Sequence, residues 1–263
     1  MFIHRLIYLL NRLKEDPVYI YRSIVQRIIY REIFFINDFF RRQKKIIVIY
    51  TLGKSASTSV QLSLCKKYKT RRVYQVHFLN QKNLKKQQIE QFASNHIRAK
   101  KIKSIISSVE PENIIYVTII RDPFEREISS YFQNRNWYSK FDNQLMDLNM
   151  YFKKSNLNMS INWIFDELLD YFNIDPEEVK VINKNGLIYN CENKSKIYFL
   201  RFENLRESIY NLFDGANLLK LNSSNQKNYS EERKNIKIDD IFDNQRYIKV
   251  RDSRFCKFYY PKY

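Results

Sequence analysis

Two short segments of the chain combine hydroxyl groups with basic side chains in a pattern suited to an anion. Residues 51–59 read Thr-Leu-Gly-Lys-Ser-Ala-Ser-Thr-Ser, and residues 121–129 read Arg-Asp-Pro-Phe-Glu-Arg-Glu-Ile-Ser. Hydroxyls, lysine and arginine bind phosphate-like oxygens, and small residues let backbone N–H groups approach such oxygens closely. Each segment therefore predicts an anion-binding site, with Lys54 and Arg121 as the charged groups.

Each segment follows an apolar run. Residues 45–50 and 113–120 are rich in isoleucine and valine, a composition typical of strands buried on both faces of a parallel sheet. Helical spacing after the first segment, and Pro123 in the second, predict helices at 58–68 and 124–132. Ligands of open α/β sheets bind beyond the carboxyl ends of the strands, so we expect both segments at one sheet edge. Two anion sites there predict a ligand with two separated phosphate groups.

Each segment also admits another interpretation. A Walker A loop, G-x-x-x-x-G-K-[ST], would need glycine where the chain has Val48, which argues against a nucleoside triphosphate loop. The first segment could instead be a hydroxyl-rich turn with an exposed Lys54, and Arg121 could simply pair with Asp122 while capping a helix. Neither structural alternative explains both segments together.

The rest of the chain continues to alternate between strand-like and helix-like segments. We expect strands at 73–79 and 196–201, helices at 161–172 and 204–213, and one helix or a pair of helices at 84–107. This alternation predicts the α/β class, with a parallel sheet and helices on both faces. We divide the chain into N-terminal amphipathic helices (1–44), an α/β core (45–222), and a C-terminal loop with a docked tail (223–263).

Composition bounds the cellular setting. The 263 residues carry a formal net charge of +18, which would attract nucleic acid, anionic lipid, acidic glycan or a nucleotide, although AT-rich coding bias also explains abundant lysine. The basic N-terminal helices could lie on a membrane surface, but such a pair more commonly covers a core. Cys65, Cys191 and Cys256 predict free thiols, and no apolar run suits a membrane span or signal peptide. We expect a cytoplasmic, bacterial protein, although the catalytic domain of a eukaryotic Golgi enzyme would look similar, and peripheral membrane association is left open.

The two segments resemble motifs of the sulfotransferases that use 3′-phosphoadenosine-5′-phosphosulfate (PAPS). Residues 54–59 are similar to their 5′-phosphosulfate loop, P-K-[ST]-G-[ST]-[ST], and residues 121–129 to their 3′-phosphate motif, R-D-P-x-x-R-x-x-S. Gly53 and Ala56 depart from the first motif, replacing its proline and glycine. The resemblance implies the P-loop-like sulfotransferase fold, catalysis without a metal, and a PAPS site formed by Lys54, Ser55, Ala56, Ser57, Thr58, Ser59, Arg121 and Ser129.

The similarity is closest to the uronyl 2-O-sulfotransferase branch, whose loop reads K-T-G-S-T-S. Residues 134–139, Asn-Arg-Asn-Trp-Tyr-Ser, also resemble the N-K-W-Y-S signature of bacterial capsular polysaccharide synthesis proteins. These resemblances imply a carbohydrate acceptor, such as a surface or capsular polysaccharide or a lipid-linked precursor. Arg126 and Arg135 could bind an acidic acceptor and Trp137 could stack on a sugar ring. Arginines on a helix are more ordinarily just exposed, and a tryptophan can equally fill the core.

Sulfuryl transfer needs a base for the acceptor hydroxyl and positive charge near the leaving phosphate. Lys54 can supply the charge. His77 is the leading candidate for the base, because it ends the second expected strand at the same sheet edge and titrates near neutral pH. In the uronyl branch a catalytic histidine stands in a V-L-H-I-N context, which residues 75–80, Gln-Val-His-Phe-Leu-Asn, resemble. A lone histidine in an apolar strand is otherwise more often structural.

Two other functions remain as alternatives. A P-loop kinase relative would require Mg²⁺ ligands and a complete Walker A loop. A nucleic-acid or membrane-surface binding module would use the net charge of +18 but would leave both strand–loop–helix segments unexplained. The residues and the resemblance together favour a PAPS-dependent carbohydrate sulfotransferase, with no metal and no nucleic-acid partner.

Overall fold

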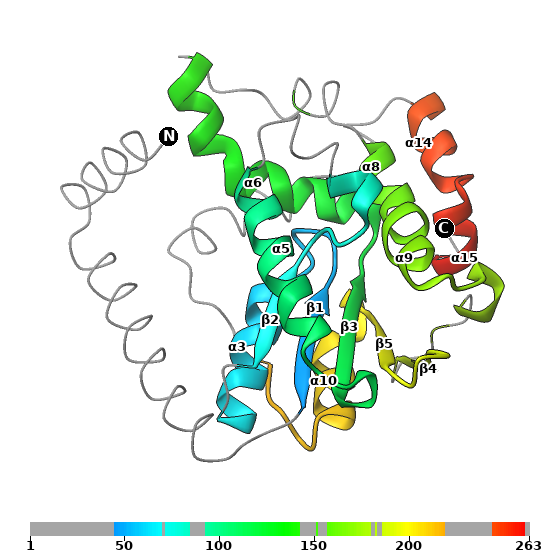
Figure 1. Cartoon of the computed structure of the whole chain (residues 1–263). Coiled ribbons are helices and arrows are strands. Elements are labelled where there is room, and N and C mark those ends of the chain that lie inside the picture. The colour runs from blue at the N-terminus through cyan, green and yellow to red at the C-terminus, as the bar shows by residue number, and fades with distance from the viewer. Residues whose placement is uncertain are drawn as a thin grey trace.

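Five β-strands form one sheet at the centre of the fold (Figure 1). The computed structural model describes residues 45–69, 72–84, 93–142, 151, 157–179, 182, 186–218 and 244–260. The strands are β1 (Ile46–Tyr50), β2 (Val73–Val76), β3 (Ile114–Ile120), β4 (Leu187–Asn190) and β5 (Lys196–Arg201). Their order in the sheet is β2-β1-β3-β5-β4, and every neighbouring pair is parallel except β4 with β5.

The strands that precede the two anion-binding segments, β1 and β3, are the most apolar. Every residue of β1 is buried, and its Ile49 lies between Gln75 of β2 and Val117 of β3. Branched side chains pack well on a pleated surface that is covered on both faces. The predicted α/β class is therefore confirmed, and the sheet, which was expected to be parallel, is mainly parallel.

The sheet differs from the prediction at two places. β4 was not predicted, because its four residues alternate between half-buried and exposed positions and lack the apolar run of a central strand. It pairs antiparallel, so the sheet is mixed. β2 ends at Val76 instead of Leu79, because the backbone N–H groups of Leu79 and Asn80 donate to a side chain, Glu167, rather than to a neighbouring strand.

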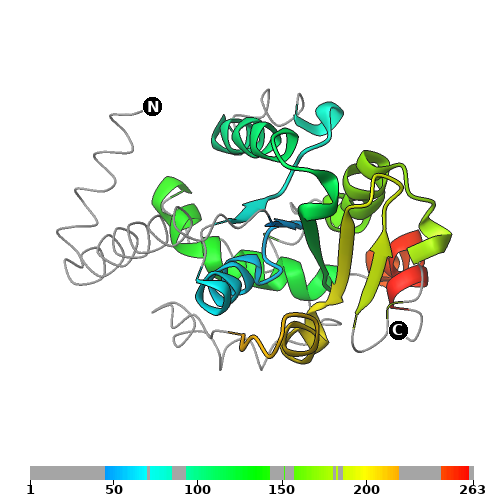
Figure 2. The ribbon, with the colours of Figure 1, turned by 60° about the horizontal axis from the view of Figure 1, so that its bottom comes forward.

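Helices cover both faces of the sheet (Figures 1 and 2). On one face, Leu64 of α3 and Ile209 of α10 pack with Ile49 of β1; on the other, Ile102 of α5 and Ile161 of α8 share a cluster with β1 residues. α6 begins where β3 ends and runs to Asp142 instead of ending near Phe132. The bounds are α3 (Ser57–Tyr68), α5 (Ala93–Ser107), α6 (Pro123–Asp142), α8 (Leu157–Trp163) and α10 (Leu205–Leu212).

The helix expected at 161–172 is present but contains a change of helical type. α8 continues directly into a π-helical turn, η2 (Ile164–Leu169), and then into α9 (Asp170–Phe172). A π-turn holds more residues per turn than an α-helix and often occurs at functional sites. Hydrophobic spacing predicts the helix but does not show the wider turn inside it.

Two C-terminal helices, α14 (Asn244–Arg251) and α15 (Arg254–Tyr259), pack against this core. Phe255 and Tyr259 are buried, and the backbone oxygen of Tyr259 accepts a hydrogen bond of 2.5 Å from Arg201 at the end of β5. Residues 1–44 and 219–243 lie outside the described residues, so the N-terminal helices and the loop before the docked tail stay predictions. The described residues also include three short 3₁₀ turns: η1 (Pro111–Asn113), η3 (Pro176–Val179) and η4 (Phe202–Asn204).

Within the described ranges, none of the helices has the length and apolar character that crossing a bilayer requires.

Candidate active site

The first predicted loop connects β1 to α3 through two left-handed residues. Lys54 has φ of 70° and Ala56 has φ of 58°, a conformation that glycine adopts freely and other residues rarely. Ala56 is the residue that caps the N-terminus of α3, and no side chain accepts a hydrogen bond at that cap. The N–H groups of the first helical turn are therefore oriented for an anion, which the helix dipole also favours.

The hydroxyl groups of the loop are tied to both neighbouring strands. Thr51 Oγ1 donates to the backbone oxygen of Ile119 at 2.9 Å, and Ser57 Oγ accepts a hydrogen bond of 2.7 Å from Gln75. Ser55 and Ser57 are buried, whereas Thr58 is exposed. The loop is thus held in place at its start and at the entry to α3. Gln75 was not singled out from the sequence, because nothing near it marks a polar partner for Ser57.

Arg121 joins the second loop to the first. It follows β3 directly, is only 6% exposed, and its Nη1 donates to the backbone oxygen of Lys54 at 2.7 Å. Its guanidinium lies 3.9 Å from the centre of the Phe202 ring and 3.6 Å from Glu125 Oε2. The two segments that the sequence predicts at one sheet edge are therefore in direct contact.

Ser129 lies on the side of α6 that faces Arg121. Glu125 and Ser129 are four residues apart and so share one face of the helix, and Glu125 forms the ion pair with Arg121. Ser129 is half-buried. This arrangement is compatible with Arg121 and Ser129 binding one phosphate group between them.

Asp122 has a role that the sequence only partly indicated. Its Oδ1 accepts hydrogen bonds from the backbone N–H groups of Phe124 and Glu125, which caps α6, as the capping alternative proposed. Its Oδ2 forms a buried ion pair of 2.6 Å with Arg251 of α14. The partner of this carboxylate thus comes from the C-terminal helices.

His77 is the first residue after β2, beside the phosphate-type loop. Its Nδ1 lies 2.6 Å from the backbone oxygen of Thr51, and a Cβ atom on Gly53 would be 3.8 Å from its Nε2. Because a carbonyl oxygen only accepts hydrogen bonds, Nδ1 carries the proton and Nε2 of the neutral ring has a free lone pair. The backbone oxygen of His77 accepts a hydrogen bond of 2.9 Å from Trp163 Nε1.

The surroundings of the site lower the pKa values of Lys54 and His77. Burial lowers the pKa of Lys54 to about 8; the positive charge of Arg126 acts in the same direction, and Glu127 opposes it. Burial also lowers the pKa of His77 below 6.5, against the hydrogen bond to Thr51, with nearby cations adding to the lowering. His77 is therefore neutral near pH 7, the form in which Nε2 can accept a proton.

Arg126 is not an exposed helix-surface residue. It is 9% exposed, its Nε donates to Ser160 Oγ at 3.1 Å, and its guanidinium forms an ion pair of 3.0 Å with Glu127. Ser160 and Tyr151 in turn donate to the Glu127 carboxylate. Ser160 and Tyr151 carried no sequence signal, because their role depends only on where α8 and its neighbours pack.

Side chains from both loops converge on one small cavity. Ser55, Arg121 and Arg126 are among the residues that line it, and its volume is about 20 Å³. A hydroxyl and two guanidinium groups attract anions, but a space of this volume holds about one water molecule and no phosphate group, so a phosphorylated ligand would have to bind over the loops rather than inside this cavity. In the described part of the chain, no group of three or more histidine, cysteine or acidic side chains is arranged to hold a metal ion.

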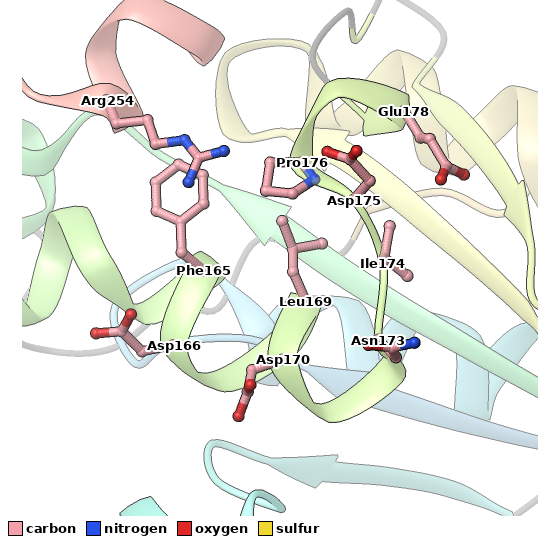
Figure 3. Close-up of a pocket in the computed structure, with 10 residues that line it drawn as sticks. All are labelled: Phe165, Asp166, Leu169, Asp170, Asn173, Ile174, Asp175, Pro176, Glu178 and Arg254. Atoms are coloured by element: carbon pink, nitrogen blue, oxygen red, sulfur yellow. The ribbon is translucent and has the colours of Figure 1, made fainter.

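A larger cavity lies away from these loops, between the η2–α9 run, the turn at 173–178 and α15 (Figure 3). Its volume is about 560 Å³. Four carboxylates and one guanidinium line it: Asp166, Asp170, Asp175, Glu178 and Arg254. This acidic lining is unfavourable for a phosphorylated nucleotide, so the loops remain the candidate donor site.

Arg135 and Trp137 lie on α6, but their side chains are outside the part of the structure that is described. Their assignment to acceptor binding stays a prediction.

Comparison with known proteins bears on the whole of this arrangement. The profile of the Sulfotransferase family matches residues 37–252, a range that includes both loops, His77 and all five strands. No curated protein and no solved structure matches the chain. The match covers most of the chain, and the two joined anion-binding loops at the carboxyl edge of the sheet agree with it. The chain therefore belongs to the sulfotransferase family, the enzymes that transfer sulfuryl groups.

Proposed function

We propose that this protein transfers the sulfuryl group of PAPS to a hydroxyl group of a carbohydrate. The observation that carries the proposal is the hydrogen bond from Arg121 Nη1 to the backbone oxygen of Lys54. It joins the loop that resembles a 5′-phosphosulfate site to the loop that resembles a 3′-phosphate site. A donor with phosphate groups at both ends would lie across these two loops, at the carboxyl edge of the sheet.

The donor would be held by charge and by directed N–H groups. The N-terminus of α3 and the hydroxyls of residues 55–59 would bind the 5′-phosphosulfate, with the Lys54 ammonium close to the bridging oxygen. Arg121 and Ser129 would bind the 3′-phosphate. PAPS supplies the activated sulfuryl group; Lys54 and the N–H groups stabilise the negative charge that develops on the leaving phosphate. The donor's charge is met by these groups alone, so we propose that no metal takes part.

His77 would act as the base that accepts the proton of the acceptor hydroxyl. Its Nδ1–H is fixed by the backbone oxygen of Thr51, which leaves Nε2 as the basic atom beside Gly53. After proton transfer the ring is an imidazolium, and the same carbonyl oxygen stabilises it through the Nδ1–H bond. His77 and Lys54 thus divide the chemistry between the acceptor and the leaving group.

The acceptor is the less defined half of the reaction. The resemblance to uronyl 2-O-sulfotransferases and to capsular polysaccharide synthesis proteins supports a surface glycan, polymeric or lipid-linked. Arg126, Arg135 and Trp137 are the residues we assign to it, in a protein that we expect to be cytoplasmic. Arg126 is ion-paired with Glu127, so we expect it to orient an acceptor or donor oxygen rather than neutralise a free carboxylate.

Calorimetric titration tests the donor half. We expect the full chain to bind 3′-phosphoadenosine-5′-phosphate (PAP), the desulfated product, with a dissociation constant on the order of micromolar without metal. Arg121→Ala should weaken binding by about tenfold or more, because one charge-assisted contact is lost. Lys196→Ala removes one positive charge from an exposed lysine at the start of β5, at the opposite edge of the sheet, and should leave binding unchanged.

Two results would contradict the proposal. Binding of ATP with Mg²⁺ that equals or exceeds binding of PAP would favour a phosphotransferase. An equal loss of affinity in Arg121→Ala and Lys196→Ala would mean that only the net charge attracts the nucleotide.

A further inference from the structure

The backbone that follows His77 is held by one buried carboxylate. Glu167, in the π-turn η2, is fully buried. Its Oε1 accepts hydrogen bonds from the backbone N–H groups of Leu79 at 2.5 Å and Asn80 at 2.7 Å, and its Oε2 accepts one from Asn83 at 2.6 Å. In the turn after His77, these backbone N–H groups therefore bond to a side chain instead of a neighbouring strand. That side chain comes from a segment about 90 residues later in the chain.

The same carboxylate also holds the strand that orients the His77 ring. The hydroxyl of Tyr50 donates to Glu167 Oε1. Tyr50 is the last residue of β1, and the next residue, Thr51, provides the backbone oxygen that accepts from His77 Nδ1. Glu167 thus connects the carbonyl that fixes the ring with the turn that follows the ring.

Trp163, four residues before Glu167, holds His77 itself. Its Nε1 donates to the backbone oxygen of His77 at 2.9 Å, and its ring is in edge contact with Tyr50, with ring centres 5.5 Å apart. Trp163 is 6% exposed, so this donor is not shared freely with water. The N–H of Trp163 bonds the His77 backbone, and the carboxylate of Glu167 bonds the backbone two and three residues later. Both side chains come from one helical run, on either side of the point where α8 becomes the π-turn.

We propose that Glu167 and Trp163 are positioning residues for His77, which they hold so that Nε2 faces the loop of Lys54. The inference rests on the proposed function in so far as His77 is the base. A displacement of a reacting group by about 1 Å can lower a rate roughly 100-fold. An apolar side chain in place of Glu167 could fill the same space, but it would accept no hydrogen bond from Leu79 or Asn80, and the turn after His77 would lose its shape.

A purely structural role makes a different prediction. In that case, substitutions at Trp163 or Glu167 would lower stability while the folded fraction kept the wild-type imidazole geometry and turnover. In a positioning role, the folded protein itself changes at His77. The test therefore needs a signal from the His77 ring in addition to activity.

The test uses the full chain labelled with ¹⁵N-histidine, as wild type, Trp163→Phe and Glu167→Gln. Only three histidines are present, so His77→Ala assigns the His77 signals. We expect wild type to show the Nδ1–H tautomer and both variants to show a mixture of tautomers. We expect kcat to fall roughly 10- to 100-fold in both variants, with KM for PAPS and affinity for PAP unchanged.

Lys82→Ala is the matched control. Lys82 lies in the same turn, and its side chain is 81% exposed. Its ion pair of 3.3 Å is with Asp170 and not with Glu167. This variant should keep the wild-type tautomer and kcat.

The inference would be overturned if a folded Trp163→Phe protein kept the wild-type kcat and the wild-type His77 tautomer. If Glu167→Gln does not fold, Trp163→Phe alone decides the question. If His77→Ala keeps full turnover, the base assignment of the proposed function is wrong. The tautomer measurement still decides whether Trp163 and Glu167 hold the ring.

Discussion

Lys54 is the charged group of the first loop whose protonation changes just above neutral pH. Burial lowers its pKa to about 8, so its ammonium is largely charged at pH 7 and largely neutral at pH 9. A phosphate group binds the charged form. The affinity of the site for a nucleotide anion should therefore depend on pH in a window where the phosphate groups, which titrate near about 6, no longer change.

We expect the affinity for PAP to fall as pH rises above about 8, by up to about tenfold per pH unit until the anion must bind the neutral amine. Calorimetry between pH 6.5 and 9.5, in two buffers of different ionisation enthalpy, should show proton uptake on binding in the upper part of this range. Lys54→Arg keeps its charge throughout and should remove the pH dependence. A flat profile in the wild type would show that Lys54 does not contact the anion.

His77 predicts a limit at the acidic end. Its pKa is lowered below 6.5 by burial, so the neutral base persists at neutral pH, and kcat/KM should begin to fall only below pH 6.5.

His77→Ala should lower kcat roughly 10²- to 10⁴-fold while leaving PAP affinity unchanged, because the ring is assigned to the acceptor and not to the donor. Steady-state rates as a function of pH, with PAP titrations alongside, check both points. Unchanged turnover would remove His77 as the base.

At the scale of elements, the loop between β1 and α3 has a backbone shape better suited to glycine than to Ala56. The residue adopts φ of 58°, which is strained for an L-residue with a Cβ atom. The sulfotransferase loop that this segment resembles has glycine at the same place. Alanine at this position therefore carries backbone strain, and the contacts that Thr51 and Ser57 make with the neighbouring strands help to hold the loop in this conformation.

We expect Ala56→Gly to stabilise the protein by about 0.5–1 kcal/mol. The substitution relieves the strain of the left-handed conformation, and the greater entropy of glycine in the unfolded chain offsets part of that gain. Urea unfolding measures the change. Ala99→Gly is the matched control: Ala99 is buried in the interior of α5, where the same substitution should destabilise by about 1 kcal/mol. Equal destabilisation by both substitutions would argue against the strain.

At the scale of the whole molecule, the C-terminal helices hold the loop that carries Arg121. The link is the ion pair between Arg251 and Asp122, which are 129 residues apart in the chain. Both side chains are nearly buried, and the Arg251 guanidinium also lies against the rings of Phe124 and Tyr247. The docked tail thus stabilises one half of the candidate donor site.

Removing one partner of a buried ion pair leaves the other charge uncompensated. Arg251→Ala should therefore destabilise the protein by about 3–5 kcal/mol, and the protein that remains folded should bind PAP more weakly because Asp122 adjoins Arg121. Denaturant unfolding and PAP titration measure the two effects. Lys257, on α15, forms an exposed pair with Asp252, and Lys257→Ala should cost less than about 1 kcal/mol. Similar losses in both variants would contradict a special role for Arg251.

The sequence by itself predicted the parts of this protein whose signals are local. β1 and β3 are short runs dominated by β-branched apolar residues, a composition typical of buried parallel strands. The loop of Lys54 and the Arg121 segment each follow such a strand, so their place at one edge of the sheet followed from the parallel topology alone. His77 was expected at the same edge for the same reason.

Only the tertiary structure decided which side chains support these groups. Four side chains contact the candidate site from distant parts of the chain: Glu167, Trp163, Ser160 and Arg251. Nothing in the sequence next to these residues indicates that they contact it. β4 was not predicted because it is a short edge strand, which can be identified only from its pairing with β5. Local sequence specifies secondary structure and exposed chemical groups, whereas the hydrogen-bond partner of a buried polar group depends on which helices pack beside it. That packing is set by the whole core at once.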